Sequence, residues 1–178
     1  MQAIELTLLC HAATEAQRVG RFHRNDDALR ETPALRQWPR VLQCLVAPER
    51  RAMQTAAALG LAGDVEAALS DLDLGHWRGL RLKDVQLTAP DALQRWLDDP
   101  QAAPHGGESL LQMSARVGVW LDHGLPPGQW LAVTHSWVMR AALQHVLGGS
   151  LSMARRIDVL PLAELRLNWQ GHWRLRVD

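Results

Sequence analysis

The sequence predicts an α/β fold in which helices cover a largely parallel sheet. Short aliphatic runs of strand length lie at residues 4–9, 41–46 and 130–134, and helical segments separate them. The C-terminal tail alternates apolar and polar residues over 165–168 and 173–177, on either side of a Gln-Gly turn, which predicts a β-hairpin. Together these patterns predict a three-layer α/β/α sandwich with a largely parallel mixed central sheet.

The first half of the chain is expected to form strand and helix in turn. Its expected elements are a strand at 4–9, a loop with one helical turn at most at 12–32, a short helix at 28–38, a strand at 41–46, a helix at 49–59 and a short strand at 65–67. Pro39 ends the first of these helices and Gly60 ends the second. Pro48 is well placed to open the helix at 49–59.

The second half continues the alternation. Its expected elements are a loop at 69–79, a helix at 81–98, a loop at 100–107, an amphipathic helix at 108–122, a turn at 124–128, a strand at 130–134, a helix at 136–147 and the hairpin. Pro90 breaks the helix at 81–98, and Gly148-Gly149 closes the helix before the hairpin.

Length and composition limit the classes of protein that remain. The 178 residues are enough for one domain, 1–178, with a single core. Nineteen basic residues balance nineteen acidic ones, so charge predicts neither nucleic-acid nor membrane binding and leaves the oligomeric state open. Cys10 and Cys44 are too few for a disulfide framework and are expected to be reduced thiols of a cytoplasmic protein. Neither a signal-peptide pattern nor a membrane-spanning apolar run is visible.

Two histidines and an arginine occupy equivalent places after predicted strands. His11 follows the strand at 4–9, His135 follows the strand at 130–134, and Arg51 lies early in the helix after the strand at 41–46. Ligands of open α/β sheets bind at the carboxyl ends of the strands, and helix N-termini favour anions. These three side chains therefore predict a phosphate site, to which Asp71 or Asp73 could supply a proton.

Each of these residues also has a purely structural interpretation. Arg51 could be a solvated helix residue, and Asp71 could cap a turn. Glu108 most simply stabilises a helix start beside Ser109. The tryptophans at 77, 96 and 137 either line an apolar pocket or belong to the core.

Five short motifs run through the chain in order. They are Cys10-His11-Ala12-Ala13-Thr14, Ala47-Pro48-Glu49-Arg50-Arg51-Ala52-Met53-Gln54-Thr55-Ala56, Asp71 before Gly75-His76-Trp77-Arg78-Gly79, Gly106-Gly107-Glu108-Ser109, and Val133-Thr134-His135-Ser136. In this order they resemble Arg-His-Gly-x-Thr, Ser-Pro-x-x-Arg-Ala-x-Gln-Thr-Ala, an acid before Gly-x-Trp-x-Gly, Gly-Gly-Glu-Ser and Val-Thr-His-Gly. Those are signatures of the histidine phosphatase superfamily, which has the phosphoglycerate-mutase-like fold.

The resemblance implies a role for each matching residue. His11 is the nucleophile that forms a phosphohistidine, and Arg51 and His135 hold the phosphoryl oxygens. Asp71 matches the family's proton donor. The substrate-binding positions implied in this way are Thr14, Gln17, Arg21 and Ser136. The resemblance implies a small phosphorylated substrate and neither metal nor cofactor.

The chain departs from the family pattern at informative positions. Cys10 replaces the arginine before the nucleophile, and a thiol cannot replace its bidentate phosphate contact. Ala12 and Ser136 replace glycines, and Asp71 is one methylene shorter than the usual Glu. Arg18, Arg21, Arg24 or His23, all in the basic loop, could compensate for the missing arginine.

Three functions remain open from the sequence. The first is a phosphomonoesterase that uses a phosphohistidine, and the second is a weak or inactive relative that binds a phosphorylated ligand or a protein partner. The third makes Cys10 the nucleophile, but cysteine phosphatases need Cys-x5-Arg and position 16 is Ala. The resemblance favours hydrolysis over mutase activity, because the family's mutases have inserted segments that shield the phosphoenzyme from water. This chain is short between Gly79 and Gly106, so water should reach the site.

Overall fold

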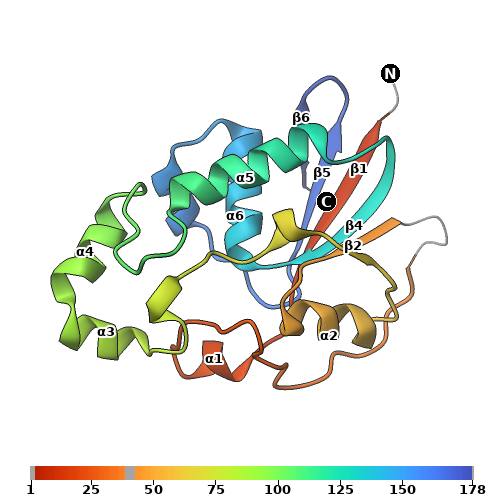
Figure 1. The fold of residues 1–178 in the computed structure, drawn as a ribbon. Coiled ribbons are helices and arrows are strands. Elements are labelled where there is room, and N and C mark those ends of the chain that lie inside the picture. The colour runs from red at the N-terminus through yellow and green to blue at the C-terminus, as the bar shows by residue number, and fades with distance from the viewer. Residues whose placement is uncertain (1–2, 39–42, 178) are drawn as a thin grey trace.

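A six-stranded mixed sheet organises the residues that the structure describes, 3–38 and 43–177 of a computed structural model (Figure 1). The strand order is β3-β2-β4-β1-β5-β6. The strands are β1 (Ile4–Cys10), β2 (Gln43–Val46), β3 (Asp64–Val65), β4 (Gly128–Thr134), β5 (Glu164–Trp169) and β6 (Trp173–Arg176). β3, β2, β4 and β1 are parallel, whereas the hairpin strands β5 and β6 join antiparallel. The predicted largely parallel mixed sheet and C-terminal hairpin are confirmed.

Helices lie on both faces of this sheet, as a three-layer fold requires. The helices are α1 (Glu15–Arg18), α2 (Arg50–Ala58), α3 (Leu82–Thr88), α4 (Pro90–Asp98), α5 (Leu110–His123) and α6 (Ser136–Leu147). α5 and α6 pack together over one face, while α2 lies against β2 and β4 from the other side (Figure 1). β4 and β1 are central and covered on both sides, which explains their nearly continuous apolar sequences.

The helices begin where local chemistry favours a start. Pro90 is the first residue of α4, so the predicted break at Pro90 is confirmed. Ser109 caps α5 in a capping box with Gln112, and Thr14 caps α1 with Gln17. Glu108 precedes the cap of α5, and its carboxylate pairs with Arg116 of the same helix.

The short helix predicted at 28–38 is wrong for these residues. Leu29 forms a bridge with Thr14, and its N–H donates to the Gln54 side chain. Contacts with segments distant in sequence therefore determine the backbone at Leu29, and a local sequence pattern does not reveal such contacts. Pro39 and the first two residues of the strand predicted at 41–46 lie outside the described residues.

Short 3₁₀ turns account for the remaining differences. The strand predicted at 65–67 ends at Val65, and a turn, η1 (Ala67–Leu69), follows it. η2 (Gly75–Trp77) lies within the predicted loop, and η3 (Leu151–Arg156) was not predicted. Such turns lack the periodicity that reveals longer helices.

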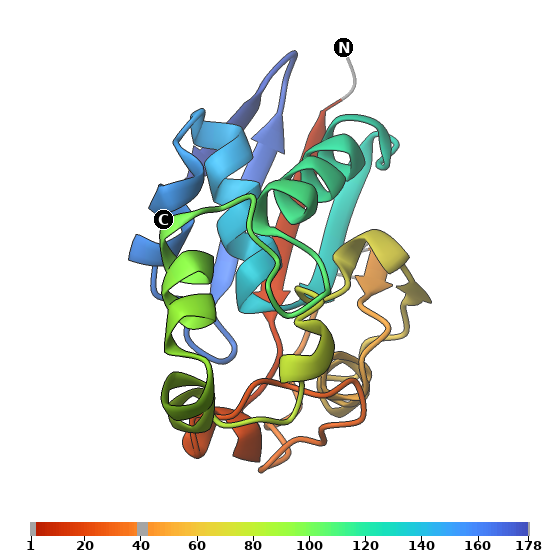
Figure 2. The ribbon, with the colours of Figure 1, turned by 60° about the vertical axis from the view of Figure 1, so that its left-hand side comes forward.

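α3 and α4 form a lobe at one side of the molecule (Figure 2). An aromatic cluster joins this lobe to the rest of the fold. Trp77 and Trp96 lie edge to face with centroids 5.8 Å apart, and Phe22 stacks on Trp77 at 5.8 Å. Trp77 and Trp96 are buried, which confirms the core interpretation for them. Trp137 packs against Trp96 and also lines the cavity described below.

Gly75 and Gly107 allow the loops that precede α3 and α5 to lie in direct backbone contact. The N–H of Glu108 donates to the Asp73 carbonyl at 2.7 Å. A Cβ at Gly107 would lie 2.1 Å from that carbonyl oxygen, and one at Gly75 would lie 2.0 Å from the His105 carbonyl oxygen. Only glycine permits this approach, so the loop that carries Asp71 and Asp73 has a fixed place beside α5.

Candidate active site

The carboxyl ends of three parallel strands bring the predicted site residues together. Cys10 at the end of β1 pairs in register with Thr134 at the end of β4, and the N–H of His11 donates to the Thr134 carbonyl at 2.9 Å. β2 ends at the same edge, since the N–H of Ala47 donates to the Val133 carbonyl. His11 and His135 therefore leave neighbouring strands together, with their ring centroids 5.2 Å apart.

His11 is held neutral with one nitrogen free. Burial lowers its pKa from 6.5 to about 3, and nearby His135 adds to this effect. Its Nδ1 lies 2.8 Å from the Ala12 carbonyl oxygen, which can only accept a hydrogen bond. Nδ1 therefore carries the proton and Nε2 keeps its lone pair, as a nucleophile requires.

Thr55 on α2 fixes the loop after His11. Its hydroxyl accepts from the N–H of Ala12 at 2.9 Å and donates to the Arg51 carbonyl at 2.7 Å. One side chain thus ties the histidine loop to the helix that carries Arg51.

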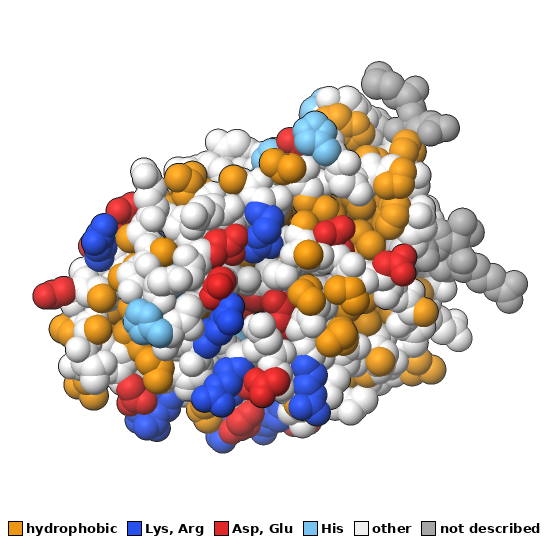
Figure 3. All heavy atoms as spheres, in the orientation of Figure 1, with side chains coloured by type: hydrophobic (Ala, Val, Ile, Leu, Met, Phe, Trp, Pro, Cys, Tyr) orange, Lys and Arg blue, Asp and Glu red, His pale blue; other side chains and the backbone are white. Residues whose placement is uncertain are grey.

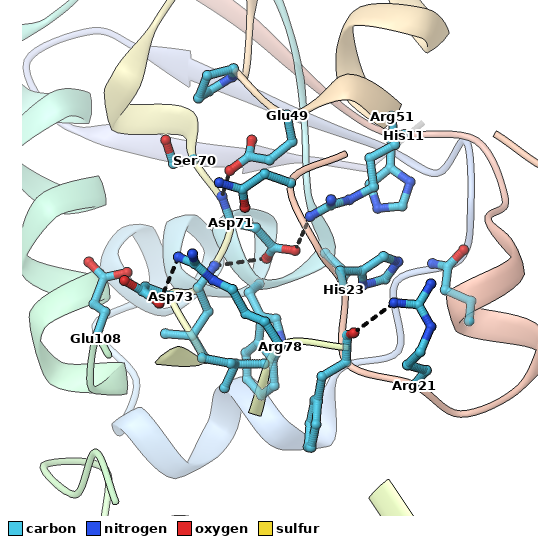
Figure 4. A pocket seen from close by; sticks show the side chains of 18 of the residues that line it. His11, Arg21, His23, Glu49, Arg51, Ser70, Asp71, Asp73, Arg78 and Glu108 are labelled. Carbon is cyan, nitrogen blue, oxygen red and sulfur yellow. Dashed lines mark hydrogen bonds and ion pairs between the residues drawn. The ribbon is translucent and has the colours of Figure 1, made fainter. Parts of the chain in front are cut away.

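Arg51 and Asp71 form a buried ion pair inside the site (Figure 4). Arg51 Nη2 lies 2.6 Å from Asp71 Oδ2, and the two side chains are 1% and 15% exposed. Burial raises the pKa of Asp71, but nearby His135 and Arg51 outweigh burial and hold it far below its usual range. Asp71 is therefore a carboxylate in this state.

His135 is bound by a carboxylate that the sequence did not assign to the site. Its Nε2 lies 2.7 Å from Glu49 Oε2, and the other oxygen of Glu49 accepts from the N–H of Asp71 at 3.0 Å. Glu49 is 6% exposed and His135 is fully buried behind Asp71. Glu49 occupies an unspecified position of the Ser-Pro-x-x-Arg pattern, so the motif gave no signal for it.

His23 is a third histidine in the site. Its ring lies 5.5 Å from that of His11, and its Nε2 lies 2.9 Å from the Thr14 hydroxyl. Burial, followed by the charge of Arg51, lowers its pKa to about 4. Of the basic loop residues, His23 is thus placed against the nucleophile, whereas Arg18 is exposed and pairs with Glu15.

The four predicted substrate-binding residues differ in their placement. Gln17, Arg21 and Ser136 line the cavity, and Ser136 opens α6 beside His135. Arg21 also pairs with Asp27 at 2.6 Å. Thr14 is buried and serves as the cap of α1 and the partner of His23, so it does not line the cavity.

The cavity has a volume of about 560 Å³ and a strongly charged lining. Acidic and basic side chains gather around the hollow on the face shown in Figure 3. At its rim Arg78 pairs with Asp73, and Arg116 pairs with Glu108, each at 2.7 Å. Phe22 and Trp137 add an apolar part to the wall.

Cys10 is placed as a core residue. Its side chain is fully buried, and burial, with a smaller effect of Asp71, raises the pKa of the thiol to about 12. A neutral, inaccessible thiol is a poor nucleophile, which argues against the cysteine-phosphatase alternative.

The described residues contain neither a metal-binding cluster nor a membrane-spanning helix. Over 3–38 and 43–177, no group of three or more His, Cys, Asp or Glu side chains is arranged to hold a metal ion. Within the same ranges no helix has the length and apolar character needed to cross a bilayer.

The lowered pKa of His11 predicts a loss of stability in acid. In the unfolded chain His11 binds a proton as the pH falls through about 6.5, whereas in the folded site it stays neutral down to about pH 3. The contribution of His11 to the free energy of unfolding is therefore fully present above about pH 6.5 and is lost as the pH falls below that value. At about pH 5 the loss from His11 is roughly 2 kcal/mol. Urea unfolding of His11→Asn at about pH 7.5 and pH 5 should show a pH difference smaller by that amount than in the wild type.

His123, which is exposed on α5, provides the matched control. His123→Asn should leave the pH difference of the wild type unchanged. An equal pH difference in wild type and His11→Asn would contradict the buried neutral histidine.

Comparison with known proteins identifies similar chains. Residues 6–176 match the family model of the histidine phosphatase superfamily (branch 1). A glucosyl-3-phosphoglycerate phosphatase of Mycolicibacterium vanbaalenii is 39% identical over 71 residues, which are 38% of this chain and 32% of that protein. The match therefore spans about a third of that relative. Phosphoserine phosphatase 1 of Hydrogenobacter thermophilus is 28% identical over 167 residues, which are 84% of this chain and 79% of that protein.

A solved structure shares the fold over nearly the full length. The mycobacterial glucosyl-3-phosphoglycerate phosphatase in complex with VO3 superimposes with a TM-score of 0.75 at 25% identity, covering 97% of each chain. The predicted family resemblance is confirmed by the family match.

Proposed function

Because the chain belongs to the histidine phosphatase superfamily, we propose that it is a phosphomonoesterase that hydrolyses a small phosphorylated metabolite through a phosphohistidine at His11. The observation that carries this proposal is the buried, neutral His11, with Nδ1 bound to a carbonyl and a free lone pair on Nε2. We further propose that residues 1–178 act as one domain, since the described strands form one sheet.

In the first step Nε2 of His11 attacks phosphorus and the bond to the leaving oxygen breaks. Arg51 donates to the phosphoryl oxygens and stabilises the charge that spreads over them. To do so it must exchange its contact with Asp71 for one with the phosphoryl group. Asp71 then loses an ion-pair partner that lowers its pKa, so it can take up a proton from water or from the substrate monoanion and pass that proton to the leaving oxygen.

In the second step water attacks the phosphohistidine. Asp71 accepts the proton of the water, the P–N bond breaks and inorganic phosphate leaves. Ser136 and Gln17 line the cavity and are proposed to bind the substrate, together with Arg21 once it leaves Asp27.

The rim supports a substrate with a second anionic group. Arg78 is 39% exposed and its partner Asp73 is 47% exposed, so a carboxylate could replace this weak pair at small cost. The names of the relatives, glucosyl-3-phosphoglycerate phosphatase and phosphoserine phosphatase, both describe phosphate esters of organic acids. We therefore propose a small phosphorylated organic acid as the substrate class.

Turnover of a generic aryl phosphate tests the proposed activity. The wild type is expected to release phosphate without added metal, to be inhibited by orthovanadate, and to form an acid-labile, alkali-stable phosphoprotein. As a control, dialysis of the protein against a chelator before the assay should leave the rate of phosphate release unchanged.

One observation favours the second candidate, an inactive binder. Both proposed cationic partners of phosphate are paired with carboxylates, Arg51 with Asp71 and His135 with Glu49. An absence of turnover and of phosphoprotein, with inorganic phosphate still raising the melting temperature, would favour this candidate over the enzyme.

A further inference from the structure

Glu49 has a place in the site that neither its helix position nor its chemistry would predict. It is the N-cap of α2, where a carboxylate usually caps the free N–H groups of the first turn. Its side chain makes no such bond and reaches His135 and the N–H of Asp71. Because burial of an unpaired carboxylate is costly, these two contacts are what keep Glu49 in the interior.

The contact with Glu49 determines which nitrogen of His135 faces the reaction. A carboxylate accepts from Nε2–H, so Nδ1 is the remaining nitrogen of the ring. Nδ1 is buried without a hydrogen-bond partner and lies 3.7 Å from Asp71 Oδ2. That same oxygen binds Arg51 at 2.6 Å. A phosphoryl oxygen that replaces Asp71 beside Arg51 would therefore also approach Nδ1.

Nδ1 of His135 must carry a hydrogen to lie beside a negative oxygen of Asp71 or of phosphate. A lone pair on Nδ1 would face the negative oxygen of Asp71 or of phosphate, whereas an N–H would donate to it. With hydrogens on both nitrogens the ring is an imidazolium, and a buried imidazolium needs an anion beside it. Glu49 supplies that anion on the side away from His11.

We propose that Glu49 is a positioning residue that holds His135 as an imidazolium, with Nδ1–H directed at the transferred phosphoryl group. This inference rests on the proposed phosphatase function. The Glu49–His135 pair then presents its positive end to the phosphoryl group as a charged donor beside Arg51.

The charged and titratable groups around His135 come from four segments. They are Glu49 and Arg51 at the start of α2, Asp71 after η1, His11 after β1 and His23 in the loop after α1. His11 and His23 are neutral near pH 7, because burial lowers their pKa values. Glu49 is therefore the anion that a substitution can remove while the side chains of His11 and Asp71 both remain.

Glu49→Gln tests the proposal, since the amide keeps the shape but loses the charge, and its one oxygen can replace only one of the two carboxylate oxygens that bind His135 and the N–H of Asp71. We expect kcat to fall roughly ten- to hundredfold, because His135 loses the carboxylate that orients it. Glu108→Gln is the matched control, because Glu108 lines the same cavity but pairs with Arg116, and it should leave the hydrogens on the His135 ring as they are in the wild type.

Imidazole ¹H–¹⁵N correlation spectra provide a readout that does not need turnover. With inorganic phosphate present, His135 of the wild type should carry hydrogen on both nitrogens at a pH where Glu49→Gln carries it on one. The His135 signals are identified by their loss in His135→Asn. Equal protonation of His135 in wild type and Glu49→Gln would overturn the role of Glu49, whereas absent turnover with the expected spectra would overturn only the phosphatase function.

Discussion

Replacing His11 with alanine will remove both aryl-phosphate turnover and the covalent phosphoprotein, with a loss in kcat of roughly a thousandfold or more. The reason is geometric as well as chemical. The Ala12 carbonyl and burial together leave His11 with a free lone pair, so removing this ring removes the atom that attacks phosphorus. Rapid acid-free quenching with labelled substrate measures both quantities in one experiment.

His23→Ala is the control for this experiment. His23 lies 5.5 Å from His11 and is similarly neutral, but its Nε2 is bound to Thr14. The His23→Ala variant should still form the phosphoprotein. A phosphoprotein in His11→Ala would contradict the assignment, and its loss in Cys10→Ser would point to the buried thiol instead.

Replacing Arg51 with glutamine will lower both activity and stability. Loss of a charged contact to the transition state should reduce kcat/KM by about a hundred- to thousandfold. Unfolding should become easier by about 3–5 kcal/mol, because Arg51 is 1% exposed and its removal leaves the carboxylate of Asp71 without its cation. Steady-state kinetics and urea unfolding check the two effects separately.

A double substitution separates these two effects of Arg51. Arg51→Gln combined with Asp71→Asn removes both charges, so it should recover part of the lost stability and none of the activity. Arg78→Gln is the matched single variant, since its pair with Asp73 is largely exposed and should contribute less than about 1 kcal/mol. A stable Arg51→Gln variant would show that the buried pair contributes little to folding.

Much of the fold and the centre of the site could be predicted because both depend on patterns along the chain. Strand-length apolar runs predicted β1 and β4, and the residues that follow them predicted where His11 and His135 would lie. The placement of Arg51 near Asp71 followed from the order of the motifs. These predictions succeeded because parallel strands end at one edge of a sheet.

The sequence could not define the positions of residues that distant contacts hold. His23 lies in a loop without periodicity, and the hydroxyl of Thr14 and the neighbouring ring of His11 determine its position. Glu49 looked like an ordinary residue at a helix start, and its turn toward His135 depends on β4, which is far away in sequence. The stretch at 28–38 is not helical, and Leu29 within it is held by Thr14 and Gln54.

The ion pair between Arg51 and Asp71 has a consequence for the selection of anions and for the release of product. The protein's own carboxylate occupies the place beside Arg51, so an incoming anion must compete with it. Singly charged ambient anions gain little from that exchange, whereas a phosphoryl dianion gains more. When phosphate departs, the carboxylate of Asp71 can replace it beside Arg51, so the buried guanidinium is not left without a partner. The resting pair would thus favour rapid release of product and limit inhibition by free phosphate.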